Sequence, residues 1–372
     1  MRIGVIADNL DDQRVGGLRT YTLNLVTHLL EIDNQNQYFL IRNRAGNDFT
    51  LENAREIIVS RRGLNRFKEI RKGVVMPLTL RGYDLDIVHE TYHFGPFLFP
   101  SPYKKILTVH DISPILRKEA HTAYSALRHR MLLRTILERA HRIIADSRQT
   151  MHDLASCFGV RKEKMQVIYL AASEMYKVIS DESKLDETMS KYGLRRPFAL
   201  YVGALEPRKN LPALIAAFSK IASSIPHQLV IVGKRGWGYE EIFQAVKREN
   251  LDHRIHFPGF MPDEDLPSIY NSADFFVFPS FYEGFGLPVL EAMHCGCPVI
   301  TSNTSSLSEI AADAALLVDP YDTDMLADAM RELAGNKALM NDLADKGIER
   351  AKMFSWEKCA RETLSVYREL GP

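Results

Sequence analysis

Residues 279–300 read PSFYEGFGLPVLEAMHCGCPVI, and the order of features in this segment decides the fold. The apolar run 275–279 that leads into it predicts a buried strand. Pro288 suits the first turn of a helix, where its missing N–H costs nothing. A loop with two glycines joins the two elements. A strand, a glycine-containing loop and a helix in this order are typical of parallel sheets whose loops bind ligands.

The same segment carries groups suited to a phosphate and to hydroxyls. A helix start offers unpaired backbone N–H groups and the positive end of the helix dipole, which together bind phosphate. Gly284 and Gly286 let the backbone approach a ligand closely. Glu283 precedes the helix and Glu291 lies within its first turns, and carboxylates accept hydrogen bonds from sugar or ribose hydroxyls. Glutamates at this spacing are common, so the pair alone also fits one capping and one solvated side chain.

Short apolar strands alternate with amphipathic stretches along the rest of the chain, as in βαβ units. Strands are predicted at 2–7, 38–42, 57–60, 86–89, 106–110, 142–145 and 167–169, and, after a charged stretch at 180–196, at 198–203, 228–233, 255–257, 275–279 and 298–301. Two runs of alternating strands and helices, separated by the charged stretch, predict an α/β protein with two doubly wound parallel-sheet domains. We expect domains at 1–178 and 179–354, a final helix at 355–372, and an active site in the cleft between the domains.

Length and composition agree with two soluble domains. A chain of 372 residues is too long for one ordinary core, and 46% hydrophobic with 25% charged residues is typical of globular proteins. No stretch reaches the roughly 18 apolar residues of a membrane span, and the N-terminal run is too short for a signal peptide. The four cysteines form no zinc pattern. We therefore expect a cytoplasmic protein with reduced thiols.

The net charge is zero, but the two halves differ in sign. Residues 1–180 carry 27 Lys and Arg against 19 Asp and Glu, or 27 − 19 = +8, and the remaining residues carry 20 − 28 = −8. Basic residues gather at 61–72 and at 128–148. This asymmetry fits contact with an anionic membrane surface or a phosphate-bearing lipid, and it equally fits solvated helix faces.

A second segment, YVGALEPRKNL at 201–211, also places ligand-binding groups after a strand and before a helix. Arg208 and Lys209 put two cations near a helix N-terminus, where Lys binds phosphate as a point charge and Arg as a bidentate donor. In isolation, an Arg-Lys pair also fits a basic surface loop.

Three further signals are weaker. Gly16 and Gly17 precede an amphipathic helix at 20–30, and alone they indicate a turn. No G-x-G-x-x-G is present, so the dinucleotide fingerprint is absent. His110 ends the strand 106–110, where a lone histidine is more often structural than catalytic. Lys234 follows the strand 228–233 and is equally consistent with surface charge.

Metal sites are not expected. Asp84 and Asp86 have the spacing of a DxD pair that grips Mg²⁺ or Mn²⁺, but they lead into an apolar strand. The run DED at 263–265 predicts a helix N-terminus instead. We expect no metal and no cofactor, with basic side chains and helix dipoles neutralising the charge of the substrate.

Together these segments resemble the large retaining glycosyltransferase family 4, which has the GT-B fold. The stretch EGFGLPVLEAM at 283–293 matches the E-x7-E signature of that family, and GALEPRKN at 203–210 is similar to its G-x-x-x-P-R-K-N motif. The resemblance extends from Gly16 to Trp356. It implies two Rossmann-like domains that face a cleft, a C-terminal helix that returns to the first domain, and transfer with retained anomeric configuration.

The resemblance also implies roles for single residues. Lys209, with Arg208, holds the donor diphosphate, while Glu283 orients the sugar hydroxyls and Glu291 the ribose. The full set of implied donor contacts is Gly16, Gly17, Arg208, Lys209, Lys234, Phe260, Met261, Glu283, Gly284, Phe285, Gly286, Leu287 and Glu291. Many members carry Arg directly after the first glycine of the second motif, where this chain has Ala204, so one phosphate contact is missing or replaced.

His110 completes the implied catalytic set of Glu283, His110 and Lys209. By resemblance it lies beside the donor sugar, with Asp111 supporting it. His89 and Glu90, at the end of the preceding strand, are predicted to face the acceptor.

By this resemblance the chain moves a hexose from a nucleotide-diphosphate donor to a hydroxyl. The phrases GKRGWGYEE at 233–241 and LEPRKNL favour GDP-mannose. A glycan or polyprenyl-diphosphate-linked acceptor, as in surface polysaccharide assembly, and peripheral contact with the inner membrane fit the basic first half; nucleic acid is not an expected partner. A sugar-nucleotide epimerase, a phosphorylase or another GT-B enzyme stays open, as does a non-catalytic nucleotide-sugar-binding module.

Overall fold

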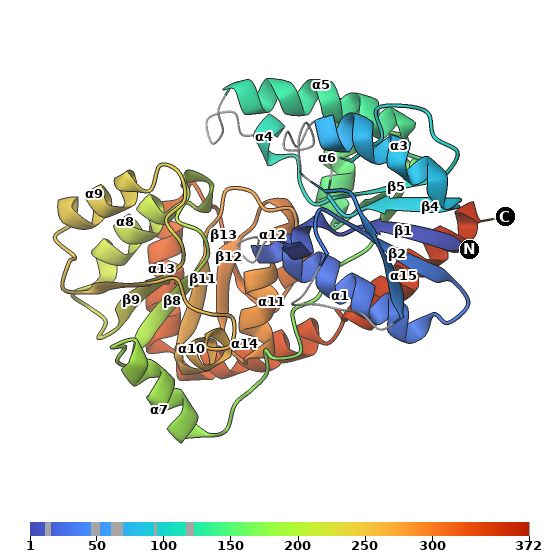
Figure 1. The fold of residues 1–372 in the computed structure, drawn as a ribbon. Coiled ribbons are helices and arrows are strands. Elements are labelled where there is room, and N and C mark those ends of the chain that lie inside the picture. The colour runs from blue at the N-terminus through green and yellow to red at the C-terminus, as the bar shows by residue number, and fades with distance from the viewer. Residues whose placement is uncertain (12–15, 46–52, 61–69, 93–94, 117–122, 372) are drawn as a thin grey trace. The chain divides into compact units, whose positions relative to one another are not determined.

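The computed structural model describes residues 1–11, 16–45, 53–60, 70–92, 95–116 and 123–371 (Figure 1). The chain divides into two compact units, one formed by Met1–Leu170 with Ser355–Pro372 and the other by Ala171–Phe354. The division after residue 170 comes earlier in the chain than the expected 178/179 boundary. One reason is that the ring of Tyr176 packs edge-on against that of Tyr270 in the second unit.

A seven-stranded parallel sheet forms the centre of the first unit, in the order β3-β2-β1-β4-β5-β6-β7. Most strand residues are buried, as expected for a parallel sheet covered on both faces. The carboxyl ends of parallel strands share one edge of the sheet. In chain order the strands are β1 Arg2–Ile6, β2 Gln37–Arg42, β3 Ala54–Ile58, β4 Ile87–Glu90, β5 Lys104–Val109, β6 Arg142–Ala145 and β7 Met165–Val167.

The helices of the first unit include one from the far end of the chain. Helix α15 packs against α1 (Figure 1). Its buried Tyr367 forms a 2.7 Å hydrogen bond with His89. The final helix is therefore part of the core of the first unit. The helices are α1 Gly16–Ile32, α3 Met76–Leu80, α4 Ser113–Leu116, α5 Ala123–Arg139, α6 Arg148–Phe158 and α15 Trp356–Leu370.

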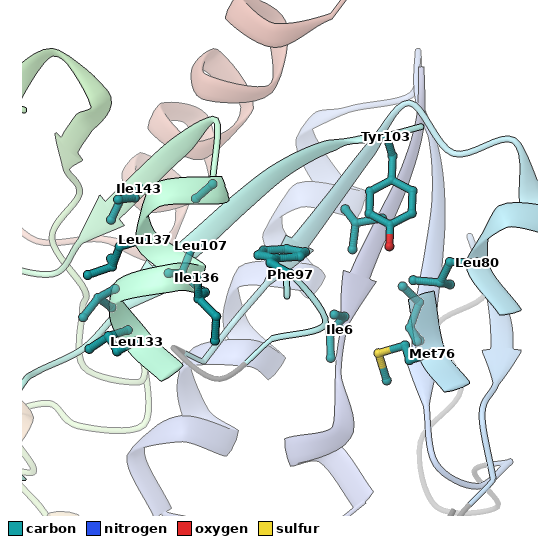
Figure 2. Packing of buried hydrophobic residues seen from close by; sticks show 14 of the residues in the cluster. Ile6, Met76, Leu80, Phe97, Tyr103, Leu107, Leu133, Ile136, Leu137 and Ile143 are labelled. Atoms are coloured by element: carbon teal, nitrogen blue, oxygen red, sulfur yellow. The ribbon is translucent and has the colours of Figure 1, made fainter. Parts of the chain in front are cut away.

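Apolar side chains from the sheet and from α3 and α5 form a continuous core in the first unit (Figure 2). Full burial of one such side chain contributes about 1.5–3 kcal/mol. This packing holds the carboxyl ends of the central strands in place. Members that Figure 2 labels are Ile6, Met76, Leu80, Phe97, Tyr103, Leu107, Leu133, Ile136, Leu137 and Ile143.

The second unit contains a six-stranded parallel sheet in the order β10-β9-β8-β11-β12-β13. The strand order reverses between β8 and β11, and ligands of doubly wound sheets bind at such a switch point. The strands are β8 Phe198–Val202, β9 Gln228–Val232, β10 Ile255–Gly259, β11 Phe275–Phe278, β12 Val299–Ser302 and β13 Leu316–Val318.

The helices of the second unit bury apolar stripes against this sheet and against one another. In α8, Leu211, Leu214, Ile215 and Phe218 recur at helical spacing and are all fully buried. The helices are α7 Glu182–Lys191, α8 Leu211–Ile221, α9 Glu240–Arg248, α10 Leu266–Ser272, α11 Leu287–His294, α12 Ser305–Ala311, α13 Thr323–Gly335 and α14 Lys337–Ala351.

The predicted architecture of two doubly wound, Rossmann-like parallel sheets is confirmed. The sequence does not predict β13, whose three residues are too few for a periodic signal. The charged stretch 180–196, taken as a break between the domains, contains helix α7. Asp181 caps this helix by accepting from the backbone N–H groups of Ser183 and Lys184.

The basic clusters need a correction. Residues 61–69 lie outside the described residues, but Arg71 and Lys72 are buried. Arg71 donates to both carboxylate oxygens of Asp8 at 2.7 Å, and the Lys72 ammonium lies 3.2 Å from both oxygens of Glu90. These two cations therefore do not face an external anionic surface. None of the helices in the described ranges combines the length and apolar character that crossing a membrane requires.

Candidate active site

The turn after β8 is tied to the loop after β11. A short 3-10 helix, Pro207–Lys209, ends at Asn210, which adopts a left-handed conformation with φ of 58°. The side-chain amide nitrogen of Asn210, Nδ2, donates to the backbone oxygens of Pro279 and Pro320 at 3.2 and 2.7 Å. This link fixes two loops at the switch point, so that charged residues from both can meet.

Arg208, Lys209 and Glu283 form a compact charged cluster. Lys209 Nζ lies 2.7 Å from Glu283 Oε1, and Arg208 Nη1 lies 2.7 Å from Glu283 Oε2. Arg208 also donates to the backbone oxygen of Tyr282 at 2.7 Å. The Lys209 ammonium lies 4.8 Å from the centre of the Phe278 ring, a cation–π distance. The structure thus brings together three residues predicted as donor contacts.

The electrostatics of this cluster favour an anion. Burial tends to raise the pKa of Glu283, but attraction to Arg208 and Lys209 outweighs burial and the net pKa is lowered. Burial lowers the pKa of Lys209, and Glu283 opposes the change. With all three ionised, these three residues carry +2 − 1 = +1, and the Glu206 carboxylate also acts on Lys209 from outside the cluster. An excess cation in a partly desolvated site attracts phosphate oxygens.

The loop from Glu283 to Gly286 is held by the start of α12. The Ser306 hydroxyl lies 2.9 and 2.7 Å from the backbone oxygens of Glu283 and Phe285. Gly286 has φ of 111°, and a Cβ there would lie 2.7 Å from the side chain of Leu307, so this position requires glycine. Pro288 lies in the first turn of α11, as predicted. A rigid loop of this kind presents the N-terminus of α11 in a fixed orientation.

Glu291 lies in a different environment from Glu283. The hydroxyl of the fully buried Tyr270 donates to Glu291 Oε2 at 3.0 Å. Burial raises the pKa of Glu291 to about 7, the Tyr270 hydrogen bond opposes the rise, and Asp263 adds to it. One glutamate of the pair is therefore held as a carboxylate, while the other titrates near neutral pH.

Glycines occupy the carboxyl ends of three neighbouring strands, β8, β9 and β10. A Cβ on Gly233 would lie 1.8 Å from the backbone oxygen of Gly203, so the strands can approach this closely only with glycine. Beyond them, Lys234 Nζ lies 4.1 Å from the centre of the half-exposed Phe260 ring. Met261 is buried, backbone included, with 1% of the residue exposed.

His110 lies in the first unit, after β5. Its Nδ1 lies 2.5 Å from Asp146 Oδ2, and its Nε2 lies 2.8 Å from the backbone oxygen of Thr91. The ring packs edge-on against Tyr21, with centroids 4.8 Å apart. Asp111, the residue expected to support His110, accepts a hydrogen bond from the backbone N–H of Ser113.

Other predicted residues of the first unit occupy unexpected positions. Gly16 and Gly17 are exposed and form the first turn of α1, not a loop. The expectation that His89 faces the acceptor is wrong, because its side chain is fully buried and bonded to Tyr367 and Thr108. Burial lowers the pKa of His89 to about 3, so this histidine is neutral. Glu90 is buried beside Lys72.

Sequence reasoning missed three supporting residues. Asp146 follows the correctly predicted strand 142–145, and its place at the carboxyl end beside His110 was the available signal. Tyr270 and Ser306 lie within the short helices α10 and α12, where no local pattern marks a polar contact. Within the described residues, no group of three or more His, Cys, Asp or Glu side chains could hold a metal ion.

Two Rossmann-like parallel-sheet units match the architecture of GT-B proteins. The family model described as "Glycosyl transferases group 1" matches residues 184–350, and that described as "Glycosyltransferase Family 4" matches residues 15–172. The chain therefore belongs to glycosyltransferase family 4 and is a transferase with the GT-B fold.

Similar proteins agree with this assignment. The chain is 35% identical over 283 residues to the O-antigen chain mannosyltransferase B of Escherichia coli, covering 75% of this chain and 74% of that protein. It is 29% identical over 275 residues to the serotype-specific mannosyltransferase WbdA of E. coli, covering 72% of this chain but only 34% of WbdA.

Among solved structures, sucrose-phosphate synthase from Thermosynechococcus elongatus superposes with a TM-score of 0.82 at 25% identity, covering 100% of this chain and 99% of that one. WaaG, a glycosyltransferase involved in lipopolysaccharide biosynthesis, gives a TM-score of 0.76 at 16% identity, covering 98% and 99%. The second likeness concerns the fold alone.

Proposed function

We propose that the protein is a retaining mannosyltransferase that uses GDP-mannose and acts without a metal ion. The acceptor is a hydroxyl of a glycan or of a polyprenyl-diphosphate-linked glycan, in the assembly of a surface polysaccharide on the cytoplasmic side of the membrane. The observation that carries the proposal is the cluster of Arg208, Lys209 and Glu283, with its net charge of +1, beside the loop that leads into α11.

The charge of this cluster matches the needs of a diphosphate leaving group. Arg208 and Lys209 are fixed by Glu283 before any ligand binds, so little reorganisation accompanies the reaction. The N-terminus of α11 adds backbone N–H groups and a positive dipole end. Together these groups stabilise the negative charge that grows on the diphosphate as the bond to the sugar breaks, without a divalent cation.

The two glutamates bind hydroxyls at opposite ends of the donor. We assign the sugar hydroxyls to Glu283, and the ribose hydroxyls to Glu291. The acceptor hydroxyl attacks the anomeric carbon from the side of the leaving group, and an oxygen of the departing diphosphate takes its proton. Catalysis then consists of positioning and charge stabilisation, with no covalent intermediate on the protein.

The choice of mannose is supported by the names of the two relatives described above, which are both mannosyltransferases. The polysaccharide context is supported in the same way, because one of them is named for the O-antigen chain. The cytoplasmic location and the contact with a membrane surface follow from the substrate proposed and from the basic first half of the sequence.

Thermal unfolding with candidate donors tests the donor assignment. GDP-mannose, UDP-glucose and ADP-glucose are each titrated into the purified protein, since a ligand of the native state adds about 2.7 kcal/mol at 100 times its Kd. We expect the midpoint to rise most with GDP-mannose. The Lys209→Ala variant should lose this rise, whereas Lys220→Ala should keep it, because Lys220 is a half-exposed lysine paired with Asp324. An equal response to all three donors, or none, contradicts the donor assignment.

Release of the nucleoside diphosphate separates an enzyme from a binding module. With GDP-mannose and a mixture of lipid-linked or free mannose-containing glycans, the enzyme produces GDP, whereas a module binds the donor and releases nothing. An unchanged anomeric configuration in the product, read by NMR, is the expected outcome for retention; inversion overturns that part of the proposal.

A further inference from the structure

Both ring nitrogens of His110 point at oxygen atoms. Nε2 lies 2.8 Å from the backbone oxygen of Thr91, which can only accept, so Nε2 carries a proton. Nδ1 lies 2.5 Å from a carboxylate oxygen of Asp146. A proton shared at this distance, with the other nitrogen already protonated, gives a doubly protonated ring when the carboxylate keeps its charge.

The surroundings of Asp146 penalise its charge, because burial raises the pKa of its carboxyl group, while the attraction and the hydrogen bond of His110 oppose that rise. Only 1% of the Asp146 side chain is exposed, and among the described residues its second oxygen, Oδ1, has no hydrogen-bond partner. A buried carboxylate with one unsatisfied oxygen is costly unless a cation compensates it. The cation within reach is the His110 ring, so each member of the pair stabilises the charge of the other.

The other titratable groups around the ring do not change this conclusion. Asp111, the next residue, also favours the charged ring, whereas burial and the neighbouring His89 oppose it. Tyr21 packs edge-on against the ring and remains protonated, because burial raises its pKa well above the usual value, as it does for the nearby Cys359. The net result is a raised pKa for His110, with burial opposing it and Asp146 as the main favourable cause.

We propose that His110 is held as a cationic ring by Asp146, which is therefore the positioning residue of this site, and that His110 acts on the substrate through its charge and not through a free ring N–H. The side chain is 14% exposed, which leaves part of the ring accessible while both N–H groups bond to the protein. This inference rests on the proposed function in requiring an anionic donor.

His110 and His89 lie on neighbouring strands but have opposite states. His89 has hydroxyl partners on both nitrogens, Tyr367 and Thr108, and is neutral. Hydroxyls can donate or accept, so they suit a neutral ring. A carboxylate and a carbonyl can only accept, and they demand two N–H groups. The partners thus decide which of the two histidines carries charge.

The protonation state is tested by NMR of the histidine ring nitrogens in the full chain, with His110→Gln used to assign the His110 signals. At about pH 7.5 the parent should show two protonated nitrogens for His110 and one for His89. In Asp146→Asn the titration midpoint of His110 should fall by at least about one pH unit, the usual effect of an opposite charge at this range. Asp111→Asn, which removes the neighbouring carboxylate, should shift the midpoint less.

The functional consequence is tested with GDP-mannose turnover against pH. Asp146→Asn should lose roughly tenfold or more in kcat near pH 8, and the deficit should shrink as the pH falls toward 6, because acid restores the charge of the ring. A purely structural role of Asp146 predicts a deficit that does not depend on pH. A neutral His110 in the parent, or equal midpoints in parent and Asp146→Asn, overturns the inference. Failure of the proposed donor is recognised separately, because the NMR arm contains no nucleotide.

Discussion

Lys209 Nζ lies 2.7 Å from Glu283 Oε1, and the two residues are 74 positions apart in the chain. Each side chain comes from a loop at the carboxyl end of a different strand, β8 for Lys209 and β11 for Glu283. These strands are neighbours at the switch point of the sheet. Strand order therefore creates this ion pair, and the excess charge of Arg208 makes the cluster attractive to a diphosphate.

Removal of the Lys209 ammonium should affect turnover strongly. In Lys209→Ala the formal charge of the cluster falls from +1 to zero, and the diphosphate loses a fixed partner. We expect kcat/KM to fall by about 10²–10³-fold, the usual effect of removing one preorganised charge-stabilising group. Steady-state release of GDP from GDP-mannose measures it. The matched control is Lys220→Ala, and an undiminished rate in Lys209→Ala would show that the cluster does not hold the leaving group.

Donor affinity should rise with pH near neutrality. Glu291 has a pKa raised to about 7, so it is protonated below that pH and becomes a carboxylate above it. A carboxylate accepts hydrogen bonds from ribose hydroxyls better than the neutral acid. The Kd for GDP-mannose should therefore fall as the pH rises through 7, by up to about tenfold per unit on the acidic side. Calorimetry at several pH values measures this Kd. GDP-mannose is a suitable ligand, because its diphosphate has no terminal phosphate that titrates near neutral pH.

Two variants identify the group responsible for that pH dependence. Glu291→Gln should flatten it. Tyr270→Phe removes a hydrogen bond that lowers the pKa of Glu291, so the midpoint should move to higher pH. Tyr176→Phe serves as the control, because it truncates a neighbouring buried tyrosine that packs on the Tyr270 ring. A midpoint that stays in place in Tyr270→Phe contradicts the role given to this hydroxyl.

A methyl group at Gly233 should disrupt the switch point. The new Cβ would lie 1.8 Å from the backbone oxygen of Gly203, and backbone cannot move aside as a flexible side chain can. We expect Gly233→Ala to lower the free energy of unfolding by about 1–3 kcal/mol and to weaken GDP-mannose binding. Denaturant unfolding measures the first effect. Gly335→Ala, with open space around its Cβ, should be close to neutral; equal stability of the two variants rules out the steric argument.

Breaking the buried ion pair of the first unit should destabilise the protein without touching the donor cluster. Arg71 is fully buried and bonds both oxygens of Asp8. Asp8→Leu leaves the Arg71 charge without this partner and should cost about 3–5 kcal/mol. The double variant Asp8→Leu with Arg71→Met should recover much of the loss, because no unpaired charge remains. Urea unfolding measures the stability of Asp8→Leu, of Arg71→Met and of the double variant. If the losses of the two single variants simply add in the double variant, the pair itself is unimportant.

An exposed ion pair gives the comparison for that experiment. Asp342 and Lys346 are about half exposed and one helical turn apart in α14. Lys346→Ala should leave the stability nearly unchanged, because solvent screens the pair. A loss as large as that of Asp8→Leu would mean that burial does not control the strength of these interactions.

Strong local patterns accounted for most of the architecture. The apolar runs 142–145 and 198–203 gave strands β6 and β8 nearly to the residue. Strand β13 and helix α7 were missed, the first because it is short and the second because its charged sequence resembles a linker. Arg71 and Lys72 were misplaced on the surface, because sequence alone does not reveal that Asp8 and Glu90 lie opposite them.

The sequence by itself determined the alternation of strands and helices and the residues of the two motifs around Lys209 and Glu283, because periodicity, glycine and proline act over short distances along the chain. Only the tertiary structure decided the partners of these residues. Asp146 is 36 positions from His110, and Tyr270 is 21 positions from Glu291. Ionisation depends on burial and on nearby charges, and both arise only when distant segments pack together. The charge states of His110 and Glu291 are therefore properties of the fold.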